Sequence, residues 1–133
     1  MYNHILLPID GTGRSERAID AGLRLAKTVG ARVTGICVSE ATYISQIDSS
    51  QHPLAESRLA EFGKAAEALG VSHESVLIVG DSPQESIVKF AAENGCDLIV
   101  MGTHGRSRVG KFLLGSVAGT ILAECEIPVL LYR

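Results

Sequence analysis

The segment VMGTHGRSRVGKFLLGS (residues 100–116) holds the residues best suited to chemistry, because it combines closely spaced glycines with basic side chains. From Gly105 it follows the P-loop pattern for binding nucleotide phosphates, but Phe112 stands where a Ser or Thr hydroxyl would bind Mg²⁺. A P-loop helix beginning near Lys111 would also be interrupted by Gly115. We therefore interpret the P-loop match as an accident of a glycine-rich segment.

A different set of glycines suits a phosphate better. Gly102 is followed after two residues by Gly105, and after nine more by the pair Gly115 and Ser116. Because glycine has no Cβ, its backbone can take positive φ and lets a phosphate approach the amides closely. A helix beginning near Ser116 would direct its N–H groups and dipole at the same anion, worth about 0.3–1 kcal/mol per exposed interaction. The spacing predicts a phosphate site built from main-chain amides, to which the Ser116 hydroxyl could add a donor.

The charged residues of this segment point to binding more than to catalysis. Arg106, Arg108 and Lys111 form a basic cluster in which one or two are expected to be solvated, and Arg106 is the candidate to offset phosphate charge. His104 is expected to be structural, since no Ser or Cys nucleophile motif lies nearby. No carboxylate pair with acid/base geometry can be identified. We therefore assign no catalytic residue.

The rest of the chain must position this segment, and it alternates apolar runs with helical periodicity. Runs typical of buried parallel strands occupy residues 4–10, 32–38, 74–80, 96–102 and 127–133. Amphipathic helices are predicted over residues 15–30, 53–70, 83–94 and 116–125. Residues 39–52 are polar and lack a clear period, which predicts a loop. Connections this short require a parallel sheet with helices on both faces, doubly wound because such crossovers are right-handed.

One helix start is signalled with particular clarity. Ser82 is suited to be an N-cap, Pro83 to the first turn, and Glu85 to closing a capping box. Doubly wound sheets bind ligands beyond the carboxyl ends of their strands, where the strand order reverses. The glycine-rich segment after the fourth strand lies on that rim, as does Asp10 after the first. Asp10 is expected either to contact the ligand or to cap the first helix.

Composition limits the remaining classes of function. A chain of 133 residues that is 46% hydrophobic and 20% charged predicts one domain over residues 1–133. A net charge of -3 argues against nucleic acid as a partner, and no apolar stretch reaches the roughly 18 residues of a membrane span. Cys37, Cys96 and Cys125 are odd in number and widely spaced, and neither cysteines nor histidines show metal-ligand spacing. We expect a cytoplasmic protein without membrane insertion or a protein-bound metal.

The sequence resembles the universal stress protein family, specifically its ATP-binding branch with the signature G-x2-G-x9-G-(S/T). Gly102, Gly105, Gly115 and Ser116 fit this signature without a gap. The resemblance spans the chain, and its further segments are ILLPID, the pair GD at 80–81, DLIVMGTHG and IPVLLYR. It implies a single α/β domain with a doubly wound, five-stranded parallel sheet in the order 3-2-1-4-5. This architecture is Rossmann-like and similar to that of the adenine nucleotide alpha hydrolases.

The resemblance also implies a ligand and a set of contacts. In similar proteins the carboxylate after strand one meets the ribose or adenine, a backbone position at the end of strand two borders adenine, and the glycine loop holds the phosphates. The ligand would be ATP, with Mg²⁺. The residues carried over by position are Pro8, Asp10, Val38, Gly102, Thr103, Gly105, Arg106, Ser107, Gly115, Ser116 and Val117.

Three functions are compatible with these residues. The first is an ATP-binding universal stress protein that acts as a nucleotide-dependent regulator or sensor in the stress response. The second is a slow ATPase or a protein that phosphorylates itself on Ser107 or Ser116. The third is a dimerisation module without a ligand. The resemblance implies a homodimer through the last strand, residues 127–133, whose apolar character would suit an uncovered sheet edge.

Overall fold

The computed structural model describes residues 1–9, 15–39, 53–103 and 115–133. Its sheet contains five strands in the order β3-β2-β1-β4-β5, and all four pairings are parallel. The predicted fold class and strand order are thereby confirmed. The elements are β1 (His4–Pro8), α1 (Ser15–Val29), β2 (Arg32–Ser39), α3 (Pro53–Leu69), β3 (His73–Val79), α4 (Pro83–Glu93), β4 (Leu98–Gly102), α5 (Ser116–Glu124) and β5 (Val129–Tyr132).

Several strand ends differ from the sequence expectation, and the later starts of β4 and β5 each have a local cause. β1 ends at Pro8 instead of continuing to residue 10. β4 begins at Leu98 instead of residue 96, because the N–H of Cys96 is donated back to the end of α4. β5 begins after Pro128, which has no N–H for the ladder. β2 extends to Ser39, one residue into the predicted loop. Asp10 and residues 40–52 of the predicted loop lie outside the described residues.

Three helices end in the same way, at a glycine with positive φ. The φ angles are 75° at Gly30, 71° at Gly70 and 67° at Gly95. The residue after each glycine donates its N–H to the carbonyl five residues earlier, as in Ala31 to Ala26 at 3.0 Å. This is the bond of a Schellman cap, which satisfies a carbonyl left without a partner at the end of a helix. The predicted left-handed cap at Gly30 is confirmed.

The predicted start of α4 is also present. Ser82 is its N-cap, with Pro83 directly after it, and the Ser82 hydroxyl accepts the N–H of Glu85 at 3.3 Å. Such a cap typically contributes about 0.5–2 kcal/mol to stability. The sequence signal and the structure agree here because a cap depends only on neighbouring residues.

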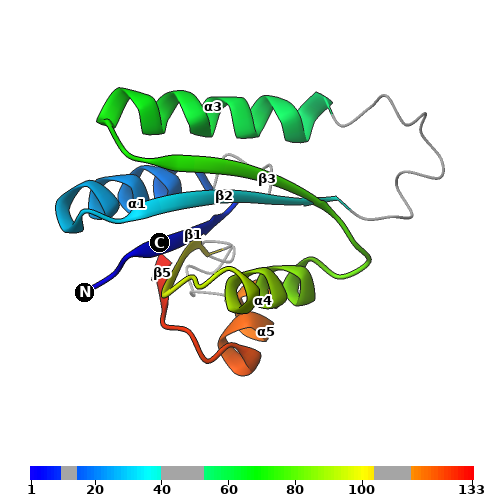
Figure 1. Cartoon of the computed structure of the whole chain (residues 1–133). Helices are drawn as coiled ribbons and strands as arrows, with labels where there is room; N and C mark the ends of the chain where they lie inside the picture. Colours follow the sequence, from blue (N-terminus) through cyan, green and yellow to red (C-terminus); the bar gives the residue numbers. More distant parts are fainter. Residues whose placement is uncertain (10–14, 40–52, 104–114) are drawn as a thin grey trace, which may run out of the picture.

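Helices α1 and α3 cover one face of the sheet, and α4 and α5 cover the other (Figure 1). The alternation of side chains along β1 divides its residues between the two faces: Ile5 and Leu7 pack with α1 and α3, whereas Leu6 packs with α4 and α5. Each face thus has its own apolar core. Among the described helices, none has both the length and the apolar character to cross a membrane.

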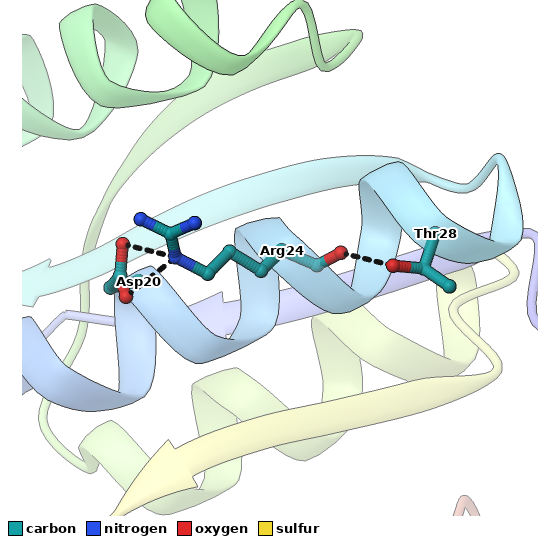
Figure 2. Close-up of polar contacts among 3 residues, drawn as sticks. All are labelled: Asp20, Arg24 and Thr28. Atoms are coloured by element: carbon teal, nitrogen blue, oxygen red, sulfur yellow. Dashed lines mark hydrogen bonds and ion pairs between the residues drawn. The ribbon is translucent and has the colours of Figure 1, made fainter.

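The outer side of α1 is polar and held by local contacts (Figure 2). The Nε–H of Arg24 donates to both carboxylate oxygens of Asp20 at 3.0 and 3.1 Å, and the Thr28 hydroxyl donates to the Arg24 carbonyl at 3.0 Å. Both charged side chains are exposed, so an ion pair at this spacing contributes only a few tenths of a kcal/mol. The helix therefore depends mainly on its buried face.

Candidate functional site

The strand order reverses between β1 and β4, which lie side by side at the middle of the sheet. β1 is paired with β2 along its whole length, up to Pro8 opposite Ile36. In the described part of the sheet, its pairing with β4 comprises Ile5 with Leu98 and Leu6 with Ile99. The carboxyl ends of β1 and β4 thus continue beyond their shared ladder. This is the location at which doubly wound sheets bind ligands.

The exit of β4 presents a buried hydroxyl group. Gly102 is half-buried, and Thr103 is only 7% exposed. The N–H of Thr103 donates to the carbonyl of Tyr132 at 3.1 Å. The Thr103 hydroxyl oxygen is buried and has no hydrogen-bond partner in the part of the chain that the structure describes. Such a group typically costs about 1–3 kcal/mol of stability, which a ligand atom could recover by hydrogen bonding.

The start of α5 presents main-chain donors. Gly115 is the N-cap, with φ of -66° and ψ of 156°, and its lack of a side chain leaves the helix start uncapped. The N–H of Gly119 donates to the Gly115 carbonyl at 2.9 Å, which is the first bond of the helix. The N–H groups of Ser116, Val117 and Ala118 precede it and have no acceptor within the helix. The predicted helix start is confirmed, and its donors suit an anion.

The ends of β1 and β2 supply a more apolar border. Pro8 and Val38 are both half-buried, and Ile9 is buried. The N–H of Ile9 donates to the carbonyl of Ile36 at 2.8 Å, which extends the contact between the two strands past Pro8. Val38 packs against the core beneath α4 and α5. These surfaces suit the flat, largely apolar base of a nucleotide better than its phosphates.

The structure brings the described candidate residues to one edge of the sheet. They are Pro8, Val38, Gly102, Thr103, Gly115, Ser116 and Val117, and they come from the carboxyl ends of β1, β2 and β4 and from the start of α5. The other four candidates, Asp10, Gly105, Arg106 and Ser107, lie outside the described residues. Their roles remain predictions.

A groove between α1 and α3 was not predicted from the sequence. It has a volume of about 230 Å³ and begins beside Ile9, at the same edge of the sheet. Arg58 lies in it, and the buried Nε of Arg58 has no hydrogen-bond partner among the described residues. Arg58 precedes the core residue Phe62 by one helical turn and so lies on the same side of α3. This spacing was the sequence signal that could have placed Arg58 beside the core. The lining residues are Ile9, Glu16, Ile19, Asp20, Arg58, Glu61, Phe62 and Ala65.

Electrostatics distinguish the two edges of the sheet. The described groups whose pKa departs clearly from its ordinary value are His4, Cys96 and Asp97. All three lie at the amino edge, where β1 begins and β4 is about to begin. These three groups therefore lie at the edge of the sheet opposite the candidate site.

Comparison with known proteins gives a consistent assignment. The sequence model of the universal stress protein family matches residues 1–133. A universal stress protein of Thermus aquaticus is 34% identical over 137 residues, covering 100% of both chains. A universal stress protein from Archaeoglobus fulgidus has a TM-score of 0.83 at 25% identity, over 100% of both chains. A universal stress protein solved in complex with cAMP has a TM-score of 0.79 at 26% identity, over 99% of this chain and 97% of that one.

These similarities extend over the whole chain, and the five-stranded parallel sheet matches the fold of the solved universal stress proteins. The chain belongs to the universal stress protein family.

Proposed function

We propose that this protein binds an adenine nucleotide, ATP together with Mg²⁺, at the carboxyl edge of its sheet and acts as a nucleotide-dependent regulator. The observation that carries the proposal is the set of N–H groups on Ser116, Val117 and Ala118, which have no acceptor within α5. Donors of this kind bind phosphate oxygens at helix starts. The cAMP complex of a relative at 26% identity supports an adenine nucleotide as the ligand.

The described residues fit such a ligand in two respects. The Thr103 hydroxyl, which has no hydrogen-bond partner among the described residues, lies at the exit of β4, directly after Gly102 of the glycine signature. The half-buried Pro8 and Val38 offer apolar surface for the base. In this proposal the phosphates contact the α5 start together with Gly105, Arg106 and Ser107, and Asp10 contacts the ribose or the base. Mg²⁺ would accompany the phosphates and reduce their charge.

A regulatory role requires that the nucleotide stays bound at the site, and does not require that the protein hydrolyses it. Bound nucleotide would fix the segment that joins β4 to α5 and so favour one form of the surface that partners contact. The alternative is a slow ATPase or self-phosphorylation, and the exposure of Ser116 at the proposed phosphate site favours the latter. We place the protein in the cytoplasm, because its cysteines are odd in number and widely spaced.

A homodimer through residues 127–133 is part of the same proposal. β5 is an outer strand of the sheet, and Leu130 and Tyr132 are 44% and 37% exposed on it. Exposed apolar side chains on an edge strand favour pairing with another chain. In a twofold dimer the two copies of β5 would face each other.

Calorimetric titration with ATP, ADP and AMP, with and without Mg²⁺, tests the proposed ligand. We expect saturable heat with one site per chain, and affinity that increases with the number of phosphates. Absence of heat with all three nucleotides would contradict nucleotide binding and favour the module without a ligand. Phosphate release and the mass of the protein, followed over hours with ATP, separate the regulator from the enzyme. Binding without either change supports the regulator.

A further inference from the structure

A chain of polar side chains crosses three strands at the amino edge of the sheet, opposite the proposed nucleotide site. Nε2 of His4 on β1 lies 2.7 Å from the hydroxyl oxygen of Thr34 on β2. The same hydroxyl oxygen lies 3.2 Å from Oε1 of Glu74 on β3. His4 and Thr34 are buried, at 4% and 0% exposure, whereas Glu74 is exposed. These contacts link β1 to the outer strand of the sheet.

The other ring nitrogen of His4 fixes where the imidazole keeps its proton. Nδ1 lies 3.2 Å from the main-chain carbonyl of Asn94, at the end of α4. A carbonyl oxygen can only accept, so Nδ1 carries the proton and donates it. In a neutral imidazole Nε2 then has a lone pair and no proton. The Thr34 hydroxyl, at 2.7 Å, is the stronger donor available to it, since the weakly donating thiol of Cys96 lies 3.9 Å away.

This assignment leaves Glu74 without a hydrogen bond from Thr34 when the site is neutral. A hydroxyl has one proton, and the proton of Thr34 is used on Nε2 of His4. The carboxylate oxygen of Glu74 would then face the lone pairs of the Thr34 oxygen, with no proton between them. One additional proton removes this conflict, because Nε2–H can donate to Thr34 and the Thr34 hydroxyl can donate to Glu74. A proton on the Glu74 carboxyl would also remove the conflict, because Glu74 could then donate to the Thr34 oxygen while the Thr34 hydroxyl donates to Nε2 of His4.

We propose that His4, Thr34 and Glu74 form a shared proton-binding site, in which uptake of one proton ties β3 to the centre of the sheet and its loss releases the Glu74 side chain. The three contacts described above are those of the protonated form. Release is open to Glu74 because it lies exposed on the outer strand β3. His4 and Thr34 have no such freedom, since both are buried. The added proton lies on Nε2 of His4, and the Thr34 hydroxyl relays its effect to Glu74 through the direction of its own hydrogen bond.

The charged groups around His4 set the pH range. Burial lowers the pKa of His4 below its ordinary 6.5, and the positive charge of Arg32 on β2 lowers it further. The Asn94 carbonyl and the carboxylates of Glu74 and Asp97 raise it, but do not offset burial. The site therefore takes up its proton below pH 6.5.

The thiol of Cys96 also touches the ring, with Sγ 3.7 Å from Nδ1 and 3.9 Å from Nε2 of His4. Burial raises the pKa of Cys96 to about 11, so its thiol stays protonated throughout the range in which His4 titrates. Burial raises the pKa of Asp97, but main-chain N–H groups lower it by a larger amount, to below 3.8, so its carboxylate stays charged above that pH. The proton that the site takes up is thus held by neither Cys96 nor Asp97.

NMR of the intact protein tests the proposal. Ring ¹⁵N shifts of His4, followed as the pH is raised from 4 to 9, report which nitrogen loses its proton. We expect Nε2 to lose it and Nδ1 to keep it, with the ¹³Cδ shift of Glu74 changing in the same step. A neutral His4 that carries its proton on Nε2 would overturn the proposal, and so would a Glu74 shift that does not follow His4.

Glu74→Gln gives a second test. A glutamine amide can donate to the Thr34 oxygen while the Thr34 hydroxyl donates to neutral His4. All three side chains are then hydrogen-bonded without an added proton. We expect the pKa of His4 to fall in this variant relative to the wild type. Glu67→Gln is the matched control, because α3 covers the face of the sheet opposite the one on which His4 contacts the end of α4. This variant should leave the His4 titration unchanged. Equal His4 pKa values in the wild type and Glu74→Gln would overturn the coupling. Because Glu74 is exposed on an outer strand, the variant is expected to fold.

Discussion

The main-chain N–H of Thr103 donates to the carbonyl oxygen of Tyr132 at 3.1 Å. This bond joins the exit of β4, where we place the nucleotide, to the end of β5, where we place the dimer contact. Two binding events that alter one shared element affect each other reciprocally. Nucleotide occupancy is therefore expected to change the dimer dissociation constant, and dimer formation to change nucleotide affinity by the same factor.

Leu130→Lys tests the dimer contact. Leu130 is 44% exposed on β5, whereas its neighbour Val129 packs against the core beneath α4 and α5. A charge at Leu130 should therefore disrupt pairing without damaging the subunit, and we expect the dissociation constant to rise about tenfold or more, equivalent to at least 1.4 kcal/mol. Sedimentation velocity measures the shift. Leu122→Lys is the control, because Leu122 is 42% exposed on α5. A dimer that survives Leu130→Lys would place the interface elsewhere.

Thr103→Val tests the buried hydroxyl at the β4 exit. Valine has nearly the same shape and removes an oxygen that has no partner in the described part of the chain. We expect the nucleotide-free protein to become more stable by about 1 kcal/mol, since the buried hydroxyl no longer has to be kept out of water. Nucleotide affinity is expected to fall. Chemical denaturation and calorimetry measure the two effects, and a loss of stability would show that the hydroxyl has a partner we have not assigned.

The close contact between β2 and α3 predicts opposite effects for two glycines. A Cβ on Gly35 would lie 2.6 Å from Cδ1 of Phe62, whose ring is fully buried, so Gly35→Ala is expected to cost about 1–3 kcal/mol. A Cβ on Gly63, within α3, would meet only Nε2 of His73 at 3.6 Å. Gly63→Ala should therefore stabilise the helix by about 0.5–1 kcal/mol. Urea unfolding compares the pair, and similar effects at both positions would contradict the packing described.

Asp97 predicts a specific loss of stability in acid. Burial raises the pKa of the Asp97 carboxyl. The main-chain N–H groups of His4 and Asn3 donate to the carboxylate at 3.0 and 2.7 Å, and their effect outweighs burial, so the pKa lies below 3.8. A lowered carboxyl pKa contributes stability that is present above the unfolded value of 3.8 and is lost as the pH falls through the folded value.

Asp97→Asn should therefore be less stable than the wild type near pH 7, with the difference shrinking as the pH falls below 3.8. The free energy of unfolding from urea titrations at a series of pH values measures this. A difference that is independent of pH down to acid would mean that the charge of Asp97 contributes nothing.

The parts of the fold that depend on neighbouring residues could be predicted from the sequence. The continuous apolar runs gave the five strands, Gly30 gave the end of α1, and Ser82 gave the start of α4. The start of α5 at Ser116 was equally clear, because Gly115 precedes a helical pattern. In these cases the backbone preference and the local hydrogen bonds indicate the same structure.

The parts that depend on strand register or helix placement could not be predicted. His4, Thr34 and Glu74 meet because Thr34 and Glu74 are register partners in adjacent strands, although they are 40 residues apart in the sequence. Nothing in the sequence around His4 indicates these contacts. The groove containing Arg58 likewise exists only because α1 and α3 lie on the same face of the sheet. Contacts of this kind have no local signal.

The claim that main-chain amides at the start of α5 hold the phosphates is tested most directly by Gly115→Asp and Gly115→Asn. The φ and ψ of Gly115 suit either residue as an N-cap, so both variants should fold, and they differ mainly in one negative charge. Calorimetric titration with ATP should give measurable heat for the wild type, weaker binding for Gly115→Asn and no heat for Gly115→Asp. Equal affinity in the two variants would contradict the account, because a carboxylate at the helix start must repel a phosphate bound there.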